Sequence, residues 1–515
     1  MIAANRRTRL AVAPLETRHV LSITLAADWL RGMQITDPAT PGYGAVVVRQ
    51  DQGVQTATGV AGYTSDAYFS ALGYRGLLKS NLWTAADLTR VGLILQEHVA
   101  HLNSDSVRPN QWYADRNGNT ISLPGTPTTP ADADDSNAAM IADLASQYVR
   151  RGGDLTWLRT DPAKQAFGNI AGVMTGLMQA DGLTWAKATY QIKYLADNCE
   201  VFVGLQAFAR LYRDVWNDPA ASDFYYAKAE VVRAAILADF YDPATGLFRT
   251  AKDGAGAYVV FDPARAYPSY LVVTPAVYGV IDRGSAAAAA QINAVTAAFP
   301  GWPTDRLDLN ATTARSALFG YAARISGDPT RAQQQADGLS DFYFPAGTVP
   351  PAPAGPMTVN EAGWLMLNAN DTNLAPTAAD RTVAVNAGAA ATFTLQGTDP
   401  NGDTLTTFVS TPPAHGTLAR VGGQWRYTPN AGYSGADSFT FRTDDGDLDS
   451  PAAGTVAITV NGAPPTRDGV YCAASGNVND SLGELQFFER QRNYTAAYTF
   501  RCNTTASGFT WSVVL

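Results

Sequence analysis

The spacing of apolar residues changes once along this chain of 515 residues, near residue 375. Before that point apolar residues recur at three- and four-residue steps, which is typical of amphipathic helices. After it they alternate with polar residues, which is typical of half-buried strands. A single hydrophobic core stops growing at about 250–300 residues. We therefore expect a multidomain chain, with an all-α part followed by all-β parts.

The helical part contains about eleven segments with helical periodicity. Their loops differ in length and no fixed sequence repeat is visible, which favours a closed ring of helical hairpins over an open solenoid. We predict an (α/α)6 toroid over residues 23–368, with its cleft at one end of the inner helices. The expected helices span residues 64–80, 84–102, 132–151, 162–178, 190–215, 222–240, 269–282, 285–299, 311–326, 329–343 and 360–367.

The β part begins after an expected linker at residues 369–374. Turn residues separate seven short strands at even spacing, which predicts an all-β sandwich over residues 375–462. These strands are expected at residues 382–385, 391–395, 404–409, 416–421, 425–428, 438–443 and 455–460. Residues 463–515 predict a small β module. Its Cys472 and Cys502 could form a disulfide, which would suit an oxidising compartment.

Composition and charge exclude several kinds of partner. The net charge is −9 and no basic patch appears, so neither nucleic acid nor an anionic membrane is an expected partner. No apolar run reaches the roughly 18 residues that span a bilayer. The four histidines are too scattered for a zinc site, and no cofactor is expected to be required. We expect a monomer.

The N-terminal residues suggest export. Residues 6–22 are basic and then mildly apolar, without the apolar core of a standard secretory signal. Leu15, Glu16, Arg18 and residues 20–22 resemble the Arg-rich leader of exported planctomycete proteins. The resemblance implies that residues 1–22 are an export leader. Charged residues make up only 16% of the chain, below the usual value of about 25%, which suits a secreted or cell-surface protein.

The first candidate carboxylates are Asp134 and Asp135, at the start of an expected helix. An aspartate there can simply cap the helix, which contributes about 0.5–2 kcal/mol. With Asp132, however, three aspartates occupy four positions, which is more than capping requires. A catalytic role and a capping role both remain open for this pair.

The second candidate pair is Asp197 and Glu200, which share an expected helix face with Tyr190 and Lys193. A solvated stripe with an ion pair between residues 193 and 197 would stabilise the helix by only a few tenths of a kcal/mol. The helix is apolar on most other sides, however, and a buried charge needs a reason because its desolvation is costly. The stripe is therefore expected to face a cleft.

Carboxylates beside aromatic loops suit a carbohydrate substrate. Sugars stack their apolar faces on Trp and Tyr, and glycoside hydrolysis needs one protonated and one ionised carboxyl group. We predict catalytic roles for Asp134, Asp135, Asp197 and Glu200. The expected substrate-binding residues stand near the starts of helices and are Asp66, Tyr68, Trp112, Tyr113, Trp185, Lys187, Tyr190, Lys193, Arg265 and Tyr270.

Two segments carry a family resemblance. Residues 131–158 (ADADDSNAAMIADLASQYVRRGGDLTWL) and 182–205 (GLTWAKATYQIKYLADNCEVFVGL) resemble the six-hairpin glycosidase superfamily. The adjacent Asp134 and Asp135 resemble glycoside hydrolase family 76, endo-mannanases of the same fold. The resemblance covers roughly residues 60–368. It implies a toroid whose catalytic acid and base come from loops or from the ends of inner helices.

Two other functions stay open. A polysaccharide lyase or sugar epimerase on the same fold would need a Tyr, His or Lys base, for which Tyr190, Lys187 and Lys193 are available. A non-catalytic carbohydrate-binding surface protein would use the carboxylates only as helix caps.

The sandwich carries a second resemblance. Residues 399–403 (DPNGD) and 427–447 (YTPNAGYSGADSFTFRTDDGD) resemble bacterial Ig-like and cadherin-like repeats, which implies a spacer. Asp399, Asp403, Asp444 and Asp445 could bind calcium, which prefers oxygen ligands. Alternatively, these residues simply form the turns.

Overall fold

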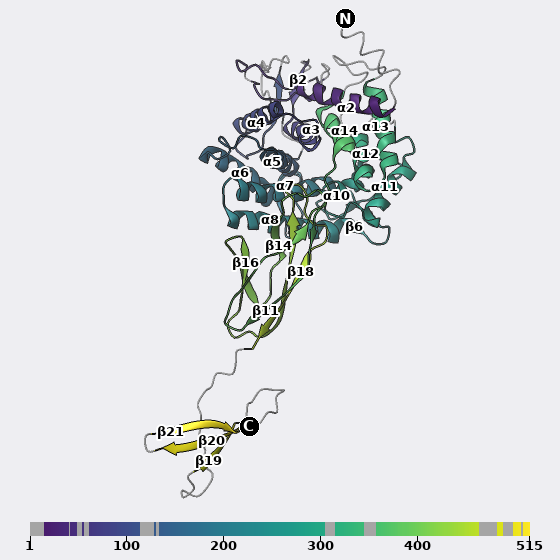
Figure 1. Cartoon of the computed structure of the whole chain (residues 1–515). Helices are drawn as coiled ribbons and strands as arrows, with labels where there is room; N and C mark the ends of the chain where they lie inside the picture. The colour runs from purple at the N-terminus through teal and green to yellow at the C-terminus, as the bar shows by residue number, and fades with distance from the viewer. Residues whose placement is uncertain are drawn as a thin grey trace.

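The computed structural model describes residues 15–40, 42–48, 54–55, 61–113, 128–129, 133–303, 315–344, 357–462, 482–487, 498–505 and 508–514. A helical domain leads into a β-sandwich, and a three-stranded sheet lies near the C-terminus (Figure 1). The multidomain fold class predicted from the sequence is confirmed.

The inner helices of the helical domain form a closed ring. Among the described residues each inner helix packs against the next, and the last returns to the first. In order around the ring they are α3 (Ala67–Lys79), α5 (Asp134–Arg150), α7 (Leu195–Asp214), α10 (Thr274–Val277), α12 (Arg315–Ile325) and α14 (Val359–Asn370). The closure distinguishes a toroid from an open solenoid, so the predicted toroid is confirmed.

An outer helix precedes each inner helix, so the described chain forms six helical hairpins. The outer helices are α2 (Leu15–Arg31), α4 (Ala85–Ala100), α6 (Asp161–Leu177), α8 (Pro219–Ala235), α11 (Ala286–Ala298) and α13 (Pro329–Tyr343). Helix α2 is not among the helices expected from the sequence. It starts within the predicted leader, and Ile23 and Leu30 are buried in the toroid core.

The fourth inner segment differs from the continuous helix predicted at residues 269–282. It consists of α9 (Ala266–Ser269), a 3-10 turn (Tyr270–Val273) and α10. Pro268 and Pro275 lack the backbone N–H that a long helix needs. Gly279 then turns the chain with a φ of 72°, a left-handed conformation that favours glycine. These breaks place Tyr278 next to the catalytic candidates described below.

Helices α3 and α14, which close the ring, approach each other through glycines. A Cβ atom added to Gly76 would lie 2.5 Å from the Cα atom of Gly363. A Cβ atom on Gly73 would lie 2.6 Å from the carbonyl oxygen of Val359. Any side chain at these positions would push the two backbones apart.

Substitution of Gly76 by Ala is therefore expected to lower the free energy of unfolding by about 1–3 kcal/mol. Gly172 in α6 is the matched control, because nothing lies within 4 Å of its Cβ position. There the same substitution is expected to raise stability by up to about 1 kcal/mol through helix propensity. Urea unfolding followed by circular dichroism measures both. Equal effects at the two positions would contradict the close crossing.

Short strands lie between the helices of the toroid. Strands β2 (Ala61–Ser65), β4 (Thr128–Thr129) and β5 (Lys193–Tyr194) each lead into an inner helix. They belong to the sheets β1-β2-β3-β4 and β5-β8-β9, and β6 and β7 form a further pair. The remaining bounds are β1 (Val54–Gln55), β3 (Asn110–Tyr113), β6 (Tyr241–Asp242), β7 (Leu247–Phe248), β8 (Ala251–Lys252) and β9 (Tyr258–Val259). A π-helical turn (Ile236–Phe240) follows α8.

The sandwich packs two sheets around a core that includes Trp425, Tyr427 and Phe439. All seven expected strands are present, with small shifts at their ends. One sheet has the order β11 (Arg381–Asn386), β18 (Gly454–Asn461), β17 (Gly435–Asp444), β14 (Thr406–Thr411). The other has the order β12 (Ala391–Phe393), β16 (Gln424–Pro429), β15 (Gly416–Val421), and β10 (Thr377–Ala378) pairs with β13 (Gly397–Thr398).

The C-terminal module is an antiparallel sheet of β19 (Leu482–Phe487), β20 (Tyr498–Thr505) and β21 (Gly508–Val514). Cys472 and the side chain of Cys502 lie outside the described residues, so their disulfide stays a prediction. Cys199 is a buried free thiol. In the part of the chain that the structure describes, none of the helices is long and apolar enough to cross a membrane.

Candidate active site

Three neighbouring inner helices, α3, α5 and α7, begin at the same end of the ring with acidic side chains. Asp66 is the N-cap of α3, and Asp134 and Asp135 open α5. Asp197 and Glu200 lie in the first two turns of α7. The free N–H groups and dipoles of helix N-termini favour carboxylates at these positions. The fold therefore brings all four predicted catalytic carboxyl groups to the same end of adjacent inner helices.

Helix α7 begins at Leu195, five residues later than predicted. Residues 193–194 pair with β8 instead, so the sheet overrides the helical periodicity there. Lys193 forms an ion pair with Asp181, and the exposed Tyr190 is hydrogen-bonded through its hydroxyl to Tyr194. The predicted continuous stripe is therefore wrong, since only Asp197 and Glu200 belong to the helix.

Glu200 is buried and held by two tyrosines. The hydroxyls of Tyr68 and Tyr278 donate to its Oε1 atom at 2.7 and 2.8 Å. Its Oε2 atom is buried and has no hydrogen-bond partner among the described residues. Burial raises the pKa of Glu200 to about 7, and the charge of Asp135 adds to this rise, whereas Arg75 opposes it. Glu200 is thus suited to carry a proton near neutral pH.

Asp135 lies fully buried beneath the start of α5. The Thr184 hydroxyl donates to its Oδ2 atom at 2.7 Å, and the backbone N–H of Ser136 donates to Oδ1 at 2.8 Å. Asn198 of α7 holds Thr184 in turn, accepting its backbone N–H at 2.8 Å. Burial raises the pKa of Asp135 to about 7. The loop before α7 therefore ties Asp135 to the helix that carries Glu200.

Asp134 is more exposed than Asp135, with 27% of its side chain accessible. The ammonium group of Lys187 lies 4.0 Å from its Oδ1 atom. Burial raises the pKa of Asp134, and Lys187 opposes that rise. The half-buried Asp197 lies one turn before Glu200. The site thus offers an accessible carboxylate, Asp134, beside two buried carboxyl groups that titrate near pH 7.

The structure places the predicted substrate-binding residues in different environments. Tyr68 contacts Glu200 and Lys187 approaches Asp134, whereas Trp185 is half-buried in the loop that carries Thr184. Asp66 accepts the backbone N–H of Phe69 at 3.1 Å, which is a helix cap.

The remaining expected residues lie in other environments. Tyr113 and Tyr270 are core residues, and Tyr270 stacks on Phe299 with ring centroids 5.4 Å apart. Arg265 is exposed, and the side chain of Trp112 lies outside the described residues. Tyr278, Thr184 and Arg75, which set the environment of the carboxyl groups, were not expected from the sequence.

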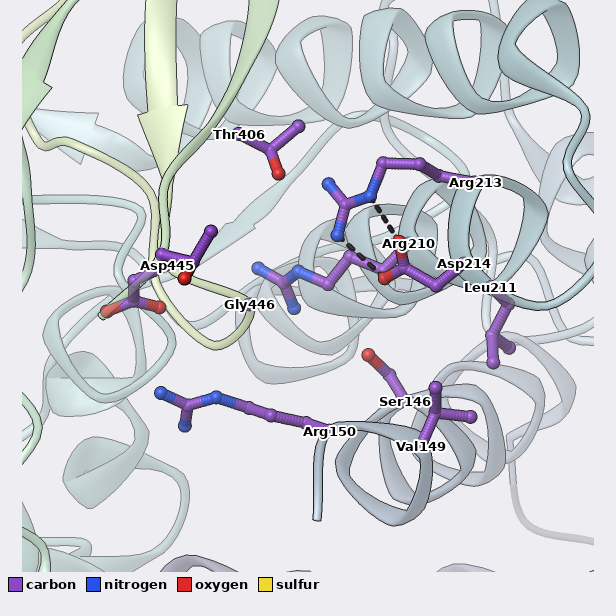
Figure 2. Close-up of a pocket in the computed structure, with 11 residues that line it drawn as sticks. Ser146, Val149, Arg150, Arg210, Leu211, Arg213, Asp214, Thr406, Asp445 and Gly446 are labelled. Carbon is purple, nitrogen blue, oxygen red and sulfur yellow. Dashed lines mark hydrogen bonds and ion pairs between the residues drawn. The ribbon is translucent and has the colours of Figure 1, made fainter. Parts of the chain in front are cut away.

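The four aspartates that could bind calcium do not gather around one point. Asp403 accepts a hydrogen bond from Arg150 at 2.8 Å, and Asp444 accepts one from Arg210 at 2.6 Å. Both arginines line a cavity between the toroid and the sandwich (Figure 2), and its volume is about 240 Å³. Across the described ranges, no group of three or more His, Cys, Asp or Glu side chains could hold a metal ion.

The buried carboxyl groups predict how stability depends on pH. An unfolded chain has carboxyl pKa values near 4, whereas Asp135 and Glu200 titrate at about 7 in the folded chain. The folded state thus binds more protons between these values. The free energy of unfolding is expected to fall as the pH rises from about 4 to about 7, and each of the two groups contributes on the order of 4 kcal/mol to the fall.

Urea unfolding at pH 5 and pH 8 measures this fall. Glu200→Gln cannot titrate, so it is expected to be about 3 kcal/mol more stable than the wild type at pH 8. An unchanged slope in this variant would contradict the raised pKa of Glu200.

Fold and site together define a carboxyl-bearing (α/α)6 toroid followed by an Ig-type sandwich. Residues 370–459 match the family model described as a bacterial Ig domain. No curated protein sequence matches the chain.

Three similar solved structures are glycosidases. A wild-type glycosidase is 14% identical, with 69% of this chain and 96% of that chain covered and a TM-score of 0.45. The GH76A α-1,6-mannanase from Salegentibacter sp. HEL1_6 is 12% identical, with 68% and 98% covered and a TM-score of 0.41. An inactive variant of the same mannanase, in complex with α-1,6-mannotriose, is 11% identical, with 68% and 98% covered and a TM-score of 0.40. Similarity at this level leaves the activity of this chain to be inferred from its own residues.

Proposed function

We propose that this chain is a secreted glycoside hydrolase that cleaves a polysaccharide or oligosaccharide by carboxyl acid–base catalysis. The observation that carries the proposal is the carboxyl cluster at the start of α5 and α7. Two buried groups, Asp135 and Glu200, titrate near pH 7 beside the more accessible Asp134. Glycoside hydrolysis requires one protonated and one ionised carboxyl group at the same site.

Glu200 is the proposed proton donor. Both tyrosine hydroxyls donate to its Oε1 atom, so the acidic proton belongs on Oε2, which has no partner among the described residues. Asp135 accepts hydrogen bonds at both of its oxygens, which favours its ionised form. Its negative charge in turn keeps the proton on Glu200. The two groups therefore act as a coupled pair that holds one proton at neutral pH.

Asp134 is the proposed base or nucleophile. It is the most accessible of the three carboxyl groups, and the nearby Lys187 favours its ionised form. The same loop carries Trp185 and the exposed Tyr190, which could stack against sugar rings. Substrate would then bind along this loop and reach Asp134 first.

The two buried tyrosines that hold Glu200 are not suited to act as the base of a lyase or an epimerase. A lyase or epimerase needs a base that loses its proton near working pH. The pKa values of Tyr68 and Tyr278 are raised well above the usual value, mainly by burial. Their hydroxyls therefore stay protonated and serve as donors to Glu200.

A polysaccharide panel tests the proposal. Purified protein is incubated with α- and β-linked glucans, mannans, xylans and galactans, and new reducing ends are measured. Release by the wild type that is lost in Asp134→Asn supports a hydrolase, provided that it is kept in the control Asp380→Asn on the exposed surface of the sandwich. Binding to a polysaccharide without release would instead indicate a carbohydrate-binding protein, and unsaturated products would indicate a lyase.

A further inference from the structure

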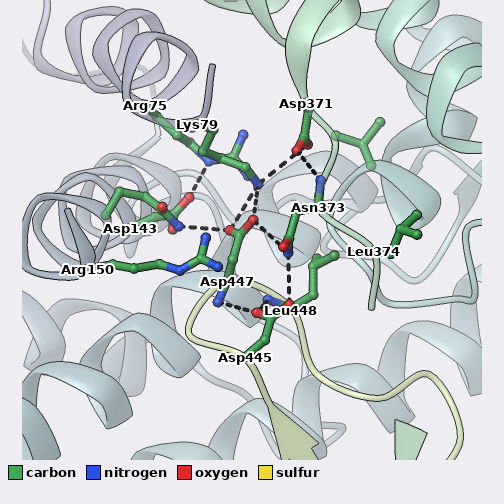
Figure 3. Close-up of polar contacts among 12 residues, drawn as sticks. Arg75, Lys79, Asp143, Arg150, Asp371, Asn373, Leu374, Asp445, Asp447 and Leu448 are labelled. Atoms are coloured by element: carbon green, nitrogen blue, oxygen red, sulfur yellow. Dashed lines mark hydrogen bonds and ion pairs between the residues drawn. The ribbon is translucent and has the colours of Figure 1, made fainter. Parts of the chain in front are cut away.

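One loop of the Ig domain enters the toroid. Residues 444–449 (DDGDLD), here called the plug loop, reach the end of the ring at which α3, α5 and α7 terminate (Figure 3). The loop carries four aspartates, and all four are buried. Burial of so many carboxylates requires compensating partners.

The centre of the plug loop is Asp447. Lys79, the last residue of α3, donates to its Oδ1 atom at 2.9 Å and lies 2.8 Å from its Oδ2 atom. Gln147 of α5 donates to Oδ1 at 2.8 Å. Lys79 and Asp447 are both almost fully buried, and Figure 3 shows their ion pair among the other polar contacts of the plug loop.

The flanking aspartates bind two further helices. Arg210 of α7 donates to Asp444 through Nη2 at 2.6 Å and through Nε at 3.0 Å. Asp449 forms an ion pair with Arg233 of α8 and accepts the Tyr226 hydroxyl at 2.9 Å. Successive carboxylates of the plug loop thus neutralise cations from different toroid helices.

Ion pairs make up much of the junction. The apolar cluster there is small and is formed by Ala209, Tyr226 and Phe408. The rings of Tyr226 and Phe408 stack with their centroids 4.0 Å apart. A cavity of about 240 Å³ remains beside the plug loop, lined in part by Arg150, Arg210 and Arg213 (Figure 2). Buried ion pairs therefore contribute more to the contact between the two domains than apolar packing does.

The toroid cations at the junction have their main anions in the plug loop. Lys79, Arg210 and Arg233 are each 3–4% exposed with the loop in place, so removal of a plug-loop carboxylate while the loop stays seated would leave a buried cation without its main anion. Removing one partner of a buried ion pair strongly destabilises a protein, whereas replacing both partners by apolar residues often does not. The polar interior of the toroid is thus completed from outside its own sequence.

We propose that the Ig domain is a structural plug of the toroid and that the two domains unfold as one cooperative unit. This role differs from the spacer that the family resemblance implies. It stands on the junction alone and does not rest on the proposed hydrolase activity.

Three variants of the full chain test the ion pairs. Asp447→Asn keeps the shape but leaves Lys79 with only Asp371, 4.0 Å away, and it is expected to lower the melting temperature by about 3–5 °C. Asp223→Asn is the matched control, since Asp223 pairs with Arg420 at 3.1 Å in the same junction but is exposed. It is expected to change the melting temperature by about 1 °C or less. The double variant Lys79→Met/Asp447→Leu is expected to recover most of the loss.

A core substitution tests cooperativity. Ile458 is buried in the sandwich, four residues into β18 and so about 13 Å along the strand from its toroid-proximal end. In calorimetry the two domains are expected to unfold in one shared transition, and Ile458→Ala is expected to lower its midpoint temperature. The substitution is also expected to speed hydrogen exchange in both the sandwich and the toroid.

Two separate transitions, with exchange in the toroid unchanged by Ile458→Ala, would overturn the proposal. Equal shifts for Asp447→Asn and Asp223→Asn would also overturn it. If Asp447→Asn gives no soluble protein, the calorimetry and hydrogen exchange of Ile458→Ala decide whether the two domains unfold together. This variant leaves every ion pair of the junction intact.

Discussion

Glu200→Gln is expected to lower kcat/KM by about 10²–10⁴-fold on the substrate that the polysaccharide panel identifies, because the variant loses its general acid. The amide can still accept both tyrosine hydroxyls through its oxygen, so the geometry around it is kept. Reducing-end assays over a range of substrate concentrations separate kcat from KM. The loss is expected in kcat, since proton transfer occurs only in the transition state.

The stability of the same variant is its control. Glu200→Gln is expected to be more stable than the wild type at pH 8, so a loss of activity cannot be assigned to unfolding. Activity within tenfold of the wild type would exclude Glu200 as the acid.

Tyr68→Phe provides a graded test. The Tyr68 hydrogen bond lowers the pKa of Glu200, so its removal is expected to raise that pKa. A general acid is active while protonated, and the alkaline limb of the pH–rate profile should therefore move to higher pH.

The carboxyl cluster could be predicted because its members stand at helix starts, where local sequence is informative. Asp134 and Asp135, together with Asp132, are more aspartates than a helix cap requires, and Glu200 is a charge on a helix that is apolar on most other sides. The residues that set the environment and the pKa values of these carboxyl groups could not be predicted in this way. Tyr278 lies 78 residues from Glu200 in sequence, and the short helices that place it depend on prolines and on Gly279. Only the closed ring brings these segments together.

The plug loop shows the limit of local sequence, which predicts the turn but not the partners of its carboxylates. Asp, Gly and Asp in succession are typical of turns and of calcium loops. Asp447, however, pairs with a lysine 368 residues away, and Asp449 pairs with an arginine 216 residues away. Local composition cannot reveal partners in another domain. The start of α7 was missed for a related reason, because β5 pairs with a strand nearly sixty residues later.

Asp143→Asn is expected to lower the free energy of unfolding by about 3–5 kcal/mol, because it leaves a buried guanidinium without its anion. Arg75 of α3 and Asp143 of α5 form an ion pair in which both side chains are at most 4% exposed. Unlike a lysine, Arg75 cannot escape the cost by losing its proton. Urea unfolding at pH 7 measures the loss. Asp28→Asn is the control, since Asp28 forms an ion pair with Arg31 but is 60% exposed, and it should change stability by less than about 1 kcal/mol.

The double variant Arg75→Met/Asp143→Leu separates stability from catalysis. Removing both charges is expected to restore most of the stability lost in Asp143→Asn. Arg75 also lies over the Tyr278 ring, 5.5 Å from its centroid, and its charge lowers the pKa of Glu200. The double variant should therefore be stable. The alkaline limb of its pH–rate profile should nevertheless move to higher pH, as in Tyr68→Phe. A stable variant with an unchanged pH–rate profile would show that the ion pair supports the fold without tuning the proton donor.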